Sequence, residues 1–179
     1  GESDRRPDLV VYVNGIALAV IELKRSTVSA HEGIRQNIRN QQDGYIPRFF
    51  TTIQLLFAGN DTEGLHYGVI KTPEKFWLRW KEPCGEPCKP SRFTAEEYPN
   101  ELDRSVLQFF DPVRLLEYIH DFIIFDGGIK KAARPNQYFA VKAAQPRICK
   151  KQNGIIWHSQ GSGKSLTMIW LARWIRENV

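Results

Sequence analysis

Two apolar runs rich in Val, Ile and Leu open the chain, at residues 8–13 and 16–24, and Asn14-Gly15 separates them. Two such runs around an Asn-Gly dipeptide predict a β-hairpin. A later pair of apolar runs is typical of two more strands, joined by a polar turn at residues 60–64. These two strands are predicted at residues 51–59 and 65–71.

Capping signals and the spacing of apolar positions predict the helices. Ser29 and Glu32 have the spacing of a capping box. Ile34 and Ile38 lie four residues apart, so a helix is expected from about residue 30 to 42. Further helices are predicted at residues 102–110, at 112–122 (with Asp111 as N-cap and Pro112 in the first position), from about Gln137, and at 164–177, with a strand at 154–158.

Two segments lack a clean period. Residues 72–100, rich in prolines and aromatic residues, are interpreted as an irregular covering segment. Residues 126–136, with two glycines and a proline, are the best candidate for a linker.

The charges at the ends of the opening hairpin depend on its register. If Asn14-Gly15 alone forms the turn, Asp8 points to the opposite face from Glu22 and Lys24, because side chains alternate along a strand. A three-residue loop of residues 13–15, with the glycine at positive φ, places all three charges on one face. We expect this second loop. In this register Tyr12 pairs with Ile16, and Asp8 pairs with Val20. The hairpin face opposite the three charges is predicted to pack on a helix, and it contains Leu9, Val11, Ala19 and Ile21.

An Asp and a Glu that converge on one hairpin face offer the oxygen ligands that Mg²⁺ prefers. Lys24 beside such a metal could orient a water and neutralise charge that builds on a phosphate. The alternative interpretation is three solvated charges at strand ends, since an Asp followed by Glu-x-Lys often arises by chance. Their position on a buried hairpin, after Arg5-Arg6-Pro7, favours the metal site.

The stretch RRPDLVVYVNGIALAVIELK resembles the PD-(D/E)xK nuclease core of the restriction subunit of type I restriction-modification enzymes. The resemblance implies that Asp8 and Glu22 hold Mg²⁺ and that Lys24 completes a centre that hydrolyses DNA phosphodiesters. Gln41 and Tyr45 match the family's Q-x-x-x-Y element near the nuclease site and would lie one helical turn apart. A core aromatic is the alternative role for Tyr45. A further acidic residue of this fold would come from a helix before Gly1.

A second candidate site lies in the stretch IIWHSQGSGKS, where an apolar run leads through a glycine-rich turn into a predicted helix. Gly161 and Gly163 would allow backbone N–H groups to surround phosphate oxygens at the N-terminus of that helix. Lys164 would reach the β- and γ-phosphates of ATP, and Ser165 would bind Mg²⁺. A plain glycine-rich turn is the alternative.

The full Walker pattern has glycine at the position of His158, so the strict match fails. The segment Gln160-Gly161-Ser162-Gly163-Lys164-Ser165 instead resembles motif I of superfamily 2 helicases. Upstream, RPNQYFAVKAA resembles the element whose glutamine recognises adenine in the same subunit family, which nominates Gln137. The three motifs occur in the order of the type I restriction subunit.

These resemblances imply an α/β fold. A PD-(D/E)xK restriction-endonuclease-like mixed sheet flanked by helices would be followed by the first strand, P-loop and helix of a RecA-like motor. The predicted domains are an N-terminally incomplete endonuclease at residues 1–125, a linker at 126–136, and the C-terminally truncated start of an ATPase/translocase at 137–179.

Composition narrows the class of partner. The net charge of +5 and the pI near 9.2 favour an acidic partner, and the resemblance names double-stranded DNA together with methylation and specificity subunits. No apolar run approaches the roughly 20 residues that cross a bilayer, so no membrane association is expected. Three cysteines provide no disulfide framework, and a cytoplasmic location is expected.

The leading hypothesis is a Mg²⁺-dependent endonuclease coupled to ATP-driven DNA translocation. Two alternatives stay open: a standalone nucleotide-binding protein with a purely structural hairpin, and a non-catalytic DNA-binding adaptor with a degenerate nuclease fold. Weaker signals are discounted. They are a zinc site at Cys84 and Cys88, base stacking by Trp77 and Trp80, and phosphate contacts by Lys130, Lys131 and Arg134.

Overall fold

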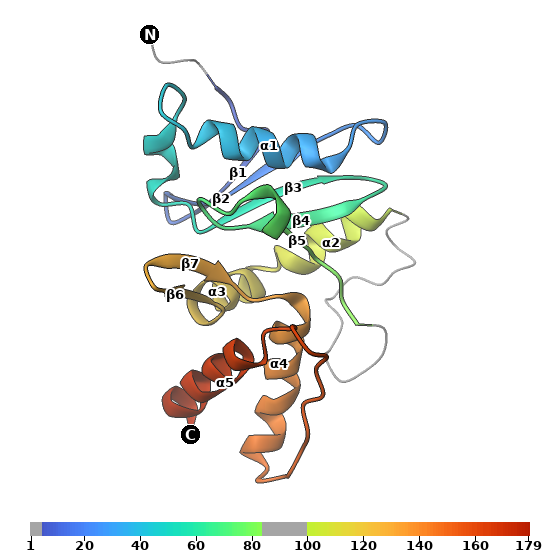
Figure 1. The fold of residues 1–179 in the computed structure, drawn as a ribbon, viewed down its shortest axis with the longest axis vertical. Helices are drawn as coiled ribbons and strands as arrows, with labels where there is room; N and C mark the ends of the chain where they lie inside the picture. Colours follow the sequence, from blue (N-terminus) through green and yellow to red (C-terminus); the bar gives the residue numbers. More distant parts are fainter. Residues whose placement is uncertain (1–4, 84–99) are drawn as a thin grey trace.

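A five-stranded mixed sheet forms the N-terminal part of the protein (Figure 1). The computed structural model describes residues 5–83 and 100–179. The strands follow one another in sequence order across the sheet, and only β2 and β3 are parallel. They are β1 (Leu9–Val13), β2 (Ile16–Leu23), β3 (Leu55–Asn60), β4 (Gly64–Gly68) and β5 (Leu78–Arg79).

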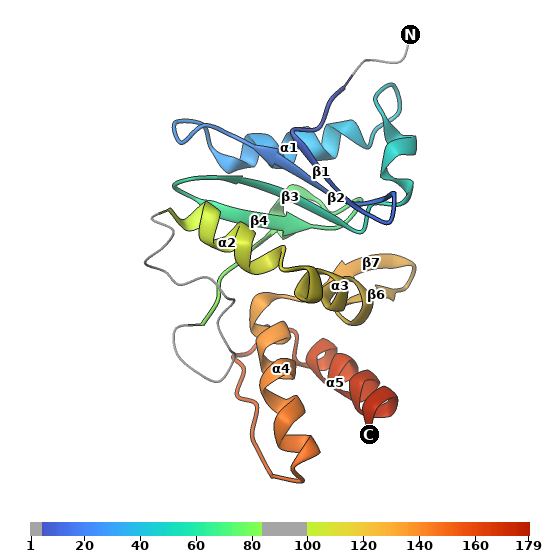
Figure 2. The same ribbon diagram turned by 180° about the vertical axis from the view of Figure 1, so that it is seen from behind.

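Helices cover both faces of this sheet (Figures 1 and 2). Helix α1 (Ala30–Asn40) is the crossover connection that the parallel pair requires, and it packs with Val20 and Leu56 on one face. Helix α2 (Glu101–Phe109) lies on the opposite face, where the predicted apolar residues Val11, Ala19 and Ile21 join the core. Leu9 was expected with them but is 50% exposed, because it lies on the outermost strand of the sheet.

Residues 72–100, which were interpreted as an irregular covering segment, contain two short elements in the part that the structure describes. The 3-10 helix η2 (Glu74–Phe76) and strand β5 lie in its first part, while residues 84–99, with Cys84 and Cys88, lie outside the described ranges. A second 3-10 helix, η1 (Pro47–Thr51), leads into β3.

Helix α3 (Pro112–Asp121) begins as predicted. The Asp111 carboxylate accepts hydrogen bonds from the backbone N–H groups of Val113 (3.1 Å) and Arg114 (3.2 Å), with proline in the first turn. The segment 126–136, predicted to be a linker, contains regular structure, namely most of a hairpin and the first two residues of a helix. Residues 123–132 form a second hairpin, β6 (Ile123–Asp126) and β7 (Ile129–Ala132), whose two-glycine turn has φ values of 56° and 80°.

The C-terminal part consists of α4 (Pro135–Cys149) and α5 (Lys164–Asn178). The strand predicted at residues 154–158 is absent, and Ile155 and Trp157 are each 90% exposed. A strand needs a neighbour to complete its backbone hydrogen bonds, and none of the described strands lies beside this segment. None of the described helices is long and apolar enough to cross a membrane.

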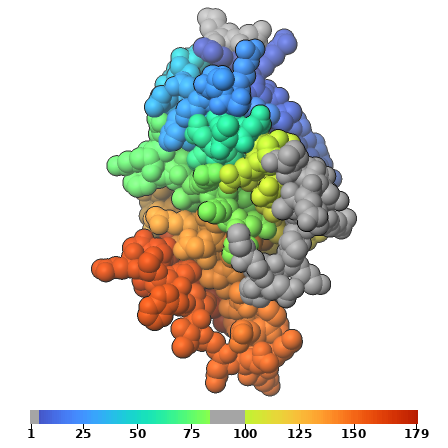
Figure 3. All heavy atoms as spheres, turned by 90° about the vertical axis from the view of Figure 1, so that its right-hand side faces the viewer, coloured from blue at the N-terminus to red at the C-terminus, as the bar shows by residue number. Residues whose placement is uncertain are grey.

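One hydrophobic core continues from the sheet into the C-terminal helices. The ring of Trp80 lies 5.6 Å from that of Tyr138 and 5.4 Å from that of Phe139, both on α4. Phe122, after α3, lies 6.5 Å from Trp170 of α5. The space-filling view accordingly shows the atoms of α4 directly below those of the strands (Figure 3). The described residues between the two candidate sites therefore form a packed junction.

Candidate functional site

The opening hairpin has a two-residue turn, so the predicted three-residue loop is wrong. Val13 pairs with Ile16, and Asn14 and Gly15 both have positive φ, at 49° and 79°. A β-bulge then shifts the register: Val11 pairs with Ala19 and Tyr12 with Ala17, which leaves Leu18 as the extra residue. The carbonyl of Leu18 accepts a hydrogen bond from the N–H of Gln54 at 2.8 Å, so the bulged peptide is satisfied from the other side.

The extra residue of the bulge brings the side chains of Asp8 and Glu22 back to the same face of the hairpin, which a two-residue turn without a bulge would not do. The ladder runs up to the pair of Leu9 with Ile21, and Asp8, the residue before β1, lies near enough to Glu22 for its charge to act on that carboxyl. The Asp8 carboxylate also accepts a hydrogen bond from the N–H of Leu23 at 2.8 Å. The two carboxylates therefore converge as expected, although by a different backbone route.

Glu22 is a fully buried carboxylate without a hydrogen-bond partner. Its exposed fraction is 0%, and neither of its oxygens has a hydrogen bond of good geometry from the described residues, although the side chains of Asp8 and Gln36 lie close enough to affect its pKa. Burial, followed by the negative charge of Asp8, raises the pKa of Glu22 to about 7, while Lys24 and Gln36 act in the opposite direction. A buried carboxylate of this kind is unfavourable unless a cation accompanies it.

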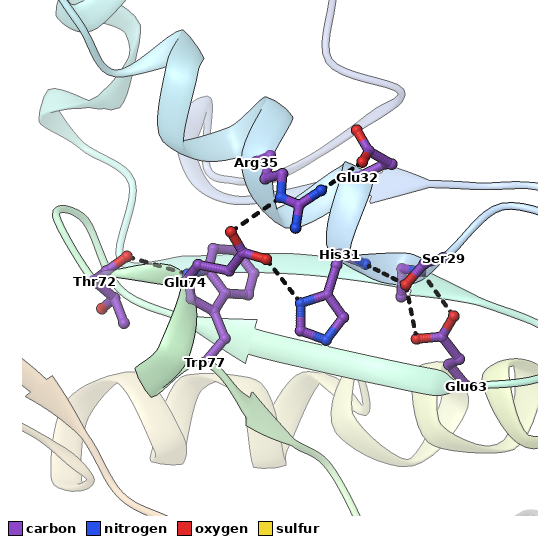
Figure 4. Close-up of polar contacts among 9 residues, drawn as sticks. Ser29, His31, Glu32, Arg35, Glu63, Thr72, Glu74 and Trp77 are labelled. Carbon is purple, nitrogen blue, oxygen red and sulfur yellow. Dashed lines mark hydrogen bonds and ion pairs between the residues drawn. The ribbon is translucent and has the colours of Figure 1, made fainter.

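Helix α1 is fixed over these groups by polar contacts at its N-terminal end (Figure 4). Ser29 caps the helix through a hydrogen bond from the N–H of His31 at 3.3 Å. The N–H of Ala30 and the hydroxyl of Ser29 donate to the carboxylate of Glu63, at 3.1 and 3.3 Å. Glu32, the expected second half of the capping box, instead binds Arg35 at 2.7 Å.

A second set of contacts ties the same helix to η2 (Figure 4). Glu74 accepts one hydrogen bond from Arg35, at 3.0 Å, and lies 3.0 Å from the ring nitrogen of His31. The hydrogen bond from Arg35, followed by that from His31, holds the pKa of Glu74 below its usual value. The α1 helix is thus held at one end by the β3–β4 turn and along one side by η2.

Gly33 lets this helix lie very close to the sheet. A Cβ at Gly33 would come within 3.1 Å of the Ala58 Cβ and within 3.2 Å of the Glu22 carbonyl oxygen. One turn further along, the side-chain oxygen of Gln36 accepts a hydrogen bond from the Lys24 ammonium at 2.7 Å. Gln36 is a site residue that the sequence reasoning missed. Its spacing in the amphipathic helix does not distinguish it from any surface glutamine.

Gln41 and Tyr45 do not form the expected pair on a helix. Helix α1 ends at Asn40, so Gln41 is its C-cap and Tyr45 lies in the following turn. Gln41 donates to the Asn37 carbonyl and accepts from the N–H of Lys71, at 2.9 and 2.8 Å. The Tyr45 ring lies 5.2 Å from the Arg5 guanidinium. A helical turn therefore does not relate the two residues, and the catalytic role given to them stays a prediction.

The ligand set for a cation is small. Among the described residues, no group of three or more His, Cys, Asp and Glu side chains could hold a metal ion. Asp8 and Glu22 supply two carboxylates, and the unpartnered oxygens of Glu22 fit a cation as their missing partner.

The glycine-rich turn leads directly into a helix. Gly161 and Gly163 have φ values of 76° and 80°, and α5 begins at Lys164. The Lys164 ammonium donates back across the loop to the carbonyl of Ser159 at 3.0 Å. The hydroxyl of Ser162 donates to the same carbonyl at 2.8 Å. Gln160 and Ser165 are exposed.

Gln137 lies against this loop. It is 1% exposed, and its side-chain nitrogen donates to the carbonyls of Ser162 (3.2 Å) and Gly163 (2.9 Å). A Cβ at position 163 would come within 2.4 Å of that nitrogen, so this approach requires glycine. The structure therefore places Gln137 on the loop backbone, and its proposed contact with adenine stays a prediction.

The discounted signals have structural explanations where they are described. Trp77 and Trp80 are buried, at 9% and 0% exposed, and are not available to stack on bases. Lys130 donates to the side chain of Gln54 at 2.6 Å, and Lys131 pairs with Asp126 at 2.5 Å.

Comparison with known protein families finds one match over each candidate site. Residues 1–75 match the family described as the type I restriction enzyme R protein N terminus, and residues 136–179 match the SWI2/SNF2 ATPase family. The first match contains the hairpin and α1, and the second contains Gln137 and the glycine-rich loop.

Curated relatives align with nearly the whole chain. Two proteins of Methanocaldococcus jannaschii, named the MjaIXP and MjaVIIP type I restriction enzyme endonuclease subunits, are 29% and 30% identical over 94% of this chain. The HindI endonuclease subunit of Haemophilus influenzae is 29% identical over 94% of it. The chain spans only 18%, 16% and 17% of these three proteins, respectively. It is thus similar to one limited region of type I restriction endonuclease subunits.

Proposed function

We propose that this chain carries the nuclease site and the first nucleotide-binding elements of the restriction subunit of a type I restriction enzyme. The observation that carries the proposal is the convergence of Asp8 with the buried, unpartnered carboxylate of Glu22, next to Lys24. The match of residues 1–75 and the names of the relatives support this assignment. The fold is then a PD-(D/E)xK nuclease sheet.

Within this proposal, Asp8 and Glu22 hold Mg²⁺, which would act as a Lewis acid towards a DNA phosphodiester oxygen. Lys24 places a positive charge beside the two carboxylates and neutralises charge that develops on the phosphate. Gln36 positions Lys24 by accepting one of its three N–H bonds, which leaves two for water or phosphate. Asp8 is exposed while Glu22 is buried, so DNA approaches from the side of Asp8.

The glycine-rich loop serves ATP in the same proposal. Lys164 would exchange the carbonyl of Ser159 for the β- and γ-phosphates, and Ser165 would bind the nucleotide's Mg²⁺. Gly161 and Gly163 keep the backbone open for phosphate oxygens. ATP hydrolysis would drive translocation along double-stranded DNA in the cytoplasm, in a complex with methylation and specificity subunits.

Substitutions in the full-length protein test the nuclease assignment. Asp8→Ala and Lys24→Ala should each abolish DNA cleavage, a loss of at least about a hundredfold, and leave ATP hydrolysis near normal. Asp61→Ala and Lys75→Ala change exposed residues of the same charge and should cleave like the wild type. If the Asp8 and Lys24 variants still cut DNA, the hairpin is purely structural and the chain is a nucleotide-binding protein. If the wild type binds DNA and never cuts it, the protein is a non-catalytic adaptor.

A further inference from the structure

A hydrogen-bond chain, buried at its first links and partly buried at its last ones, connects the N-terminal sheet to the glycine-rich loop. The hydroxyl of Tyr67, on β4, donates to the carbonyl of Ala133 at 2.6 Å, and the hydroxyl of Tyr118, on α3, donates to the same oxygen. We call these two hydroxyls the tyrosine clamp. Both tyrosines and Ala133 are fully buried, so water does not compete for the carbonyl.

The clamped peptide continues directly into Gln137. The N–H of Arg134 belongs to the same peptide unit as the Ala133 carbonyl, and it donates to the side-chain oxygen of Gln137 at 2.7 Å. That bond fixes which end of the Gln137 amide faces the loop, because the oxygen is occupied and the nitrogen must point away. The nitrogen then donates to Ser162 and Gly163. Hydrogen bonds that follow one another in such a chain polarise and reinforce each other.

We propose that Tyr67 and Tyr118 are positioning residues for the nucleotide site: they orient Gln137 and, through it, hold the phosphate loop in the conformation that binds ATP. This inference rests on the proposed nucleotide-binding function. The affinity for the nucleotide then depends on the hydroxyls of Tyr67 and Tyr118, which belong to the N-terminal part of the protein.

The state of the clamp supports this role. Burial raises the pKa of both tyrosines above the usual value, so each hydroxyl stays a donor. Two donors fill both lone pairs of one carbonyl, and the N–H of Ala133 donates to the carbonyl of Phe122 at 3.0 Å. Both the N–H and the carbonyl of Ala133 are therefore fixed by hydrogen bonds.

Conservative substitutions in the full-length protein test the inference. The double variant Tyr67→Phe with Tyr118→Phe should raise the KM for ATP by about three- to tenfold with a smaller change in kcat, because fewer molecules hold the binding-competent loop. The matched control is Tyr138→Phe. It removes a hydroxyl from the same aromatic cluster, but that hydroxyl donates to Glu117 and takes no part in the hydrogen bonds that lead to the glycine-rich loop. The control should keep the wild-type KM.

A double-mutant cycle separates positioning from a general loss of packing. Gln137→Glu keeps the acceptor for Arg134 and loses the donor to the loop. In that background the two Tyr→Phe changes should have no further effect on the KM. The inference about Tyr67 and Tyr118 would be wrong if the double variant kept the wild-type KM for ATP, or if Tyr138→Phe raised the KM by the same factor. Either result would leave the nucleotide-binding function itself untouched. A wild-type protein that hydrolyses no ATP and binds none would overturn the nucleotide-binding function as well. The single variants answer the same question if the double variant fails to fold.

Discussion

Replacing Glu22 with glutamine should remove most of the pH dependence that this residue gives to folding stability. In the folded protein the Glu22 pKa is raised from 4.5 to about 7. Between these two values the folded state keeps a proton that the unfolded state has lost, so the free energy of unfolding decreases as the pH rises. The stabilisation is complete below pH 4.5 and is lost by about pH 7. Glutamine cannot titrate and avoids this loss.

The magnitude follows from the shift. A difference of about 2.5 pH units corresponds to about 3 kcal/mol at most, of which roughly 2.5 kcal/mol falls between pH 5 and pH 8. Over that interval the wild type should therefore lose about 2.5 kcal/mol more stability than Glu22→Gln. A constant cost of burying the amide affects both pH values equally and cancels from this comparison.

Urea denaturation of the chain in metal-free buffer, repeated from pH 5 to pH 8, measures the effect. Glu32→Gln is the matched control, because Glu32 is exposed on α1 and its replacement should leave the wild-type slope unchanged. Adding Mg²⁺ at pH 8 should stabilise the wild type and leave Glu22→Gln unaffected, since a ligand stabilises only the state that binds it. If the free energy of unfolding changed equally with pH in the wild type and in Glu22→Gln, the raised pKa of Glu22 and the reasoning from its burial would be refuted.

Two further predictions concern the phosphate loop and the hairpin. Lys164→Ala should abolish ATP hydrolysis and translocation in the full-length protein, and with them any cleavage that requires movement; ATP hydrolysis at the wild-type rate would remove the phosphate-loop assignment. Gly15→Val should destabilise the protein by about 1–3 kcal/mol in thermal or urea unfolding, because a β-branched residue resists a φ of +79° although no atom lies within 4 Å of its Cβ. Wild-type stability in that variant would mean that the turn adopts another conformation.

The sequence by itself determined the elements whose signals are local. The hairpin around Asn14-Gly15, the cap at Asp111 and the glycine-rich start of α5 are each confirmed, because a few neighbouring residues decide the backbone there. The convergence of Asp8 and Glu22 was also predicted correctly. Its stated cause, a three-residue loop, was wrong.

Only the tertiary structure decided the points that depend on distant partners. The bulge at Leu18 is satisfied by Gln54 on the approach to β3, and nothing in the hairpin's own sequence marks it. The residue that follows the second hairpin is fixed by the hydroxyls of Tyr67 and Tyr118, which donate to the carbonyl of Ala133. Gln36 becomes a site residue only because α1 crosses the sheet above Lys24. In each case the deciding hydrogen bond joins residues far apart in the chain, and local sequence patterns carry no information about such pairs.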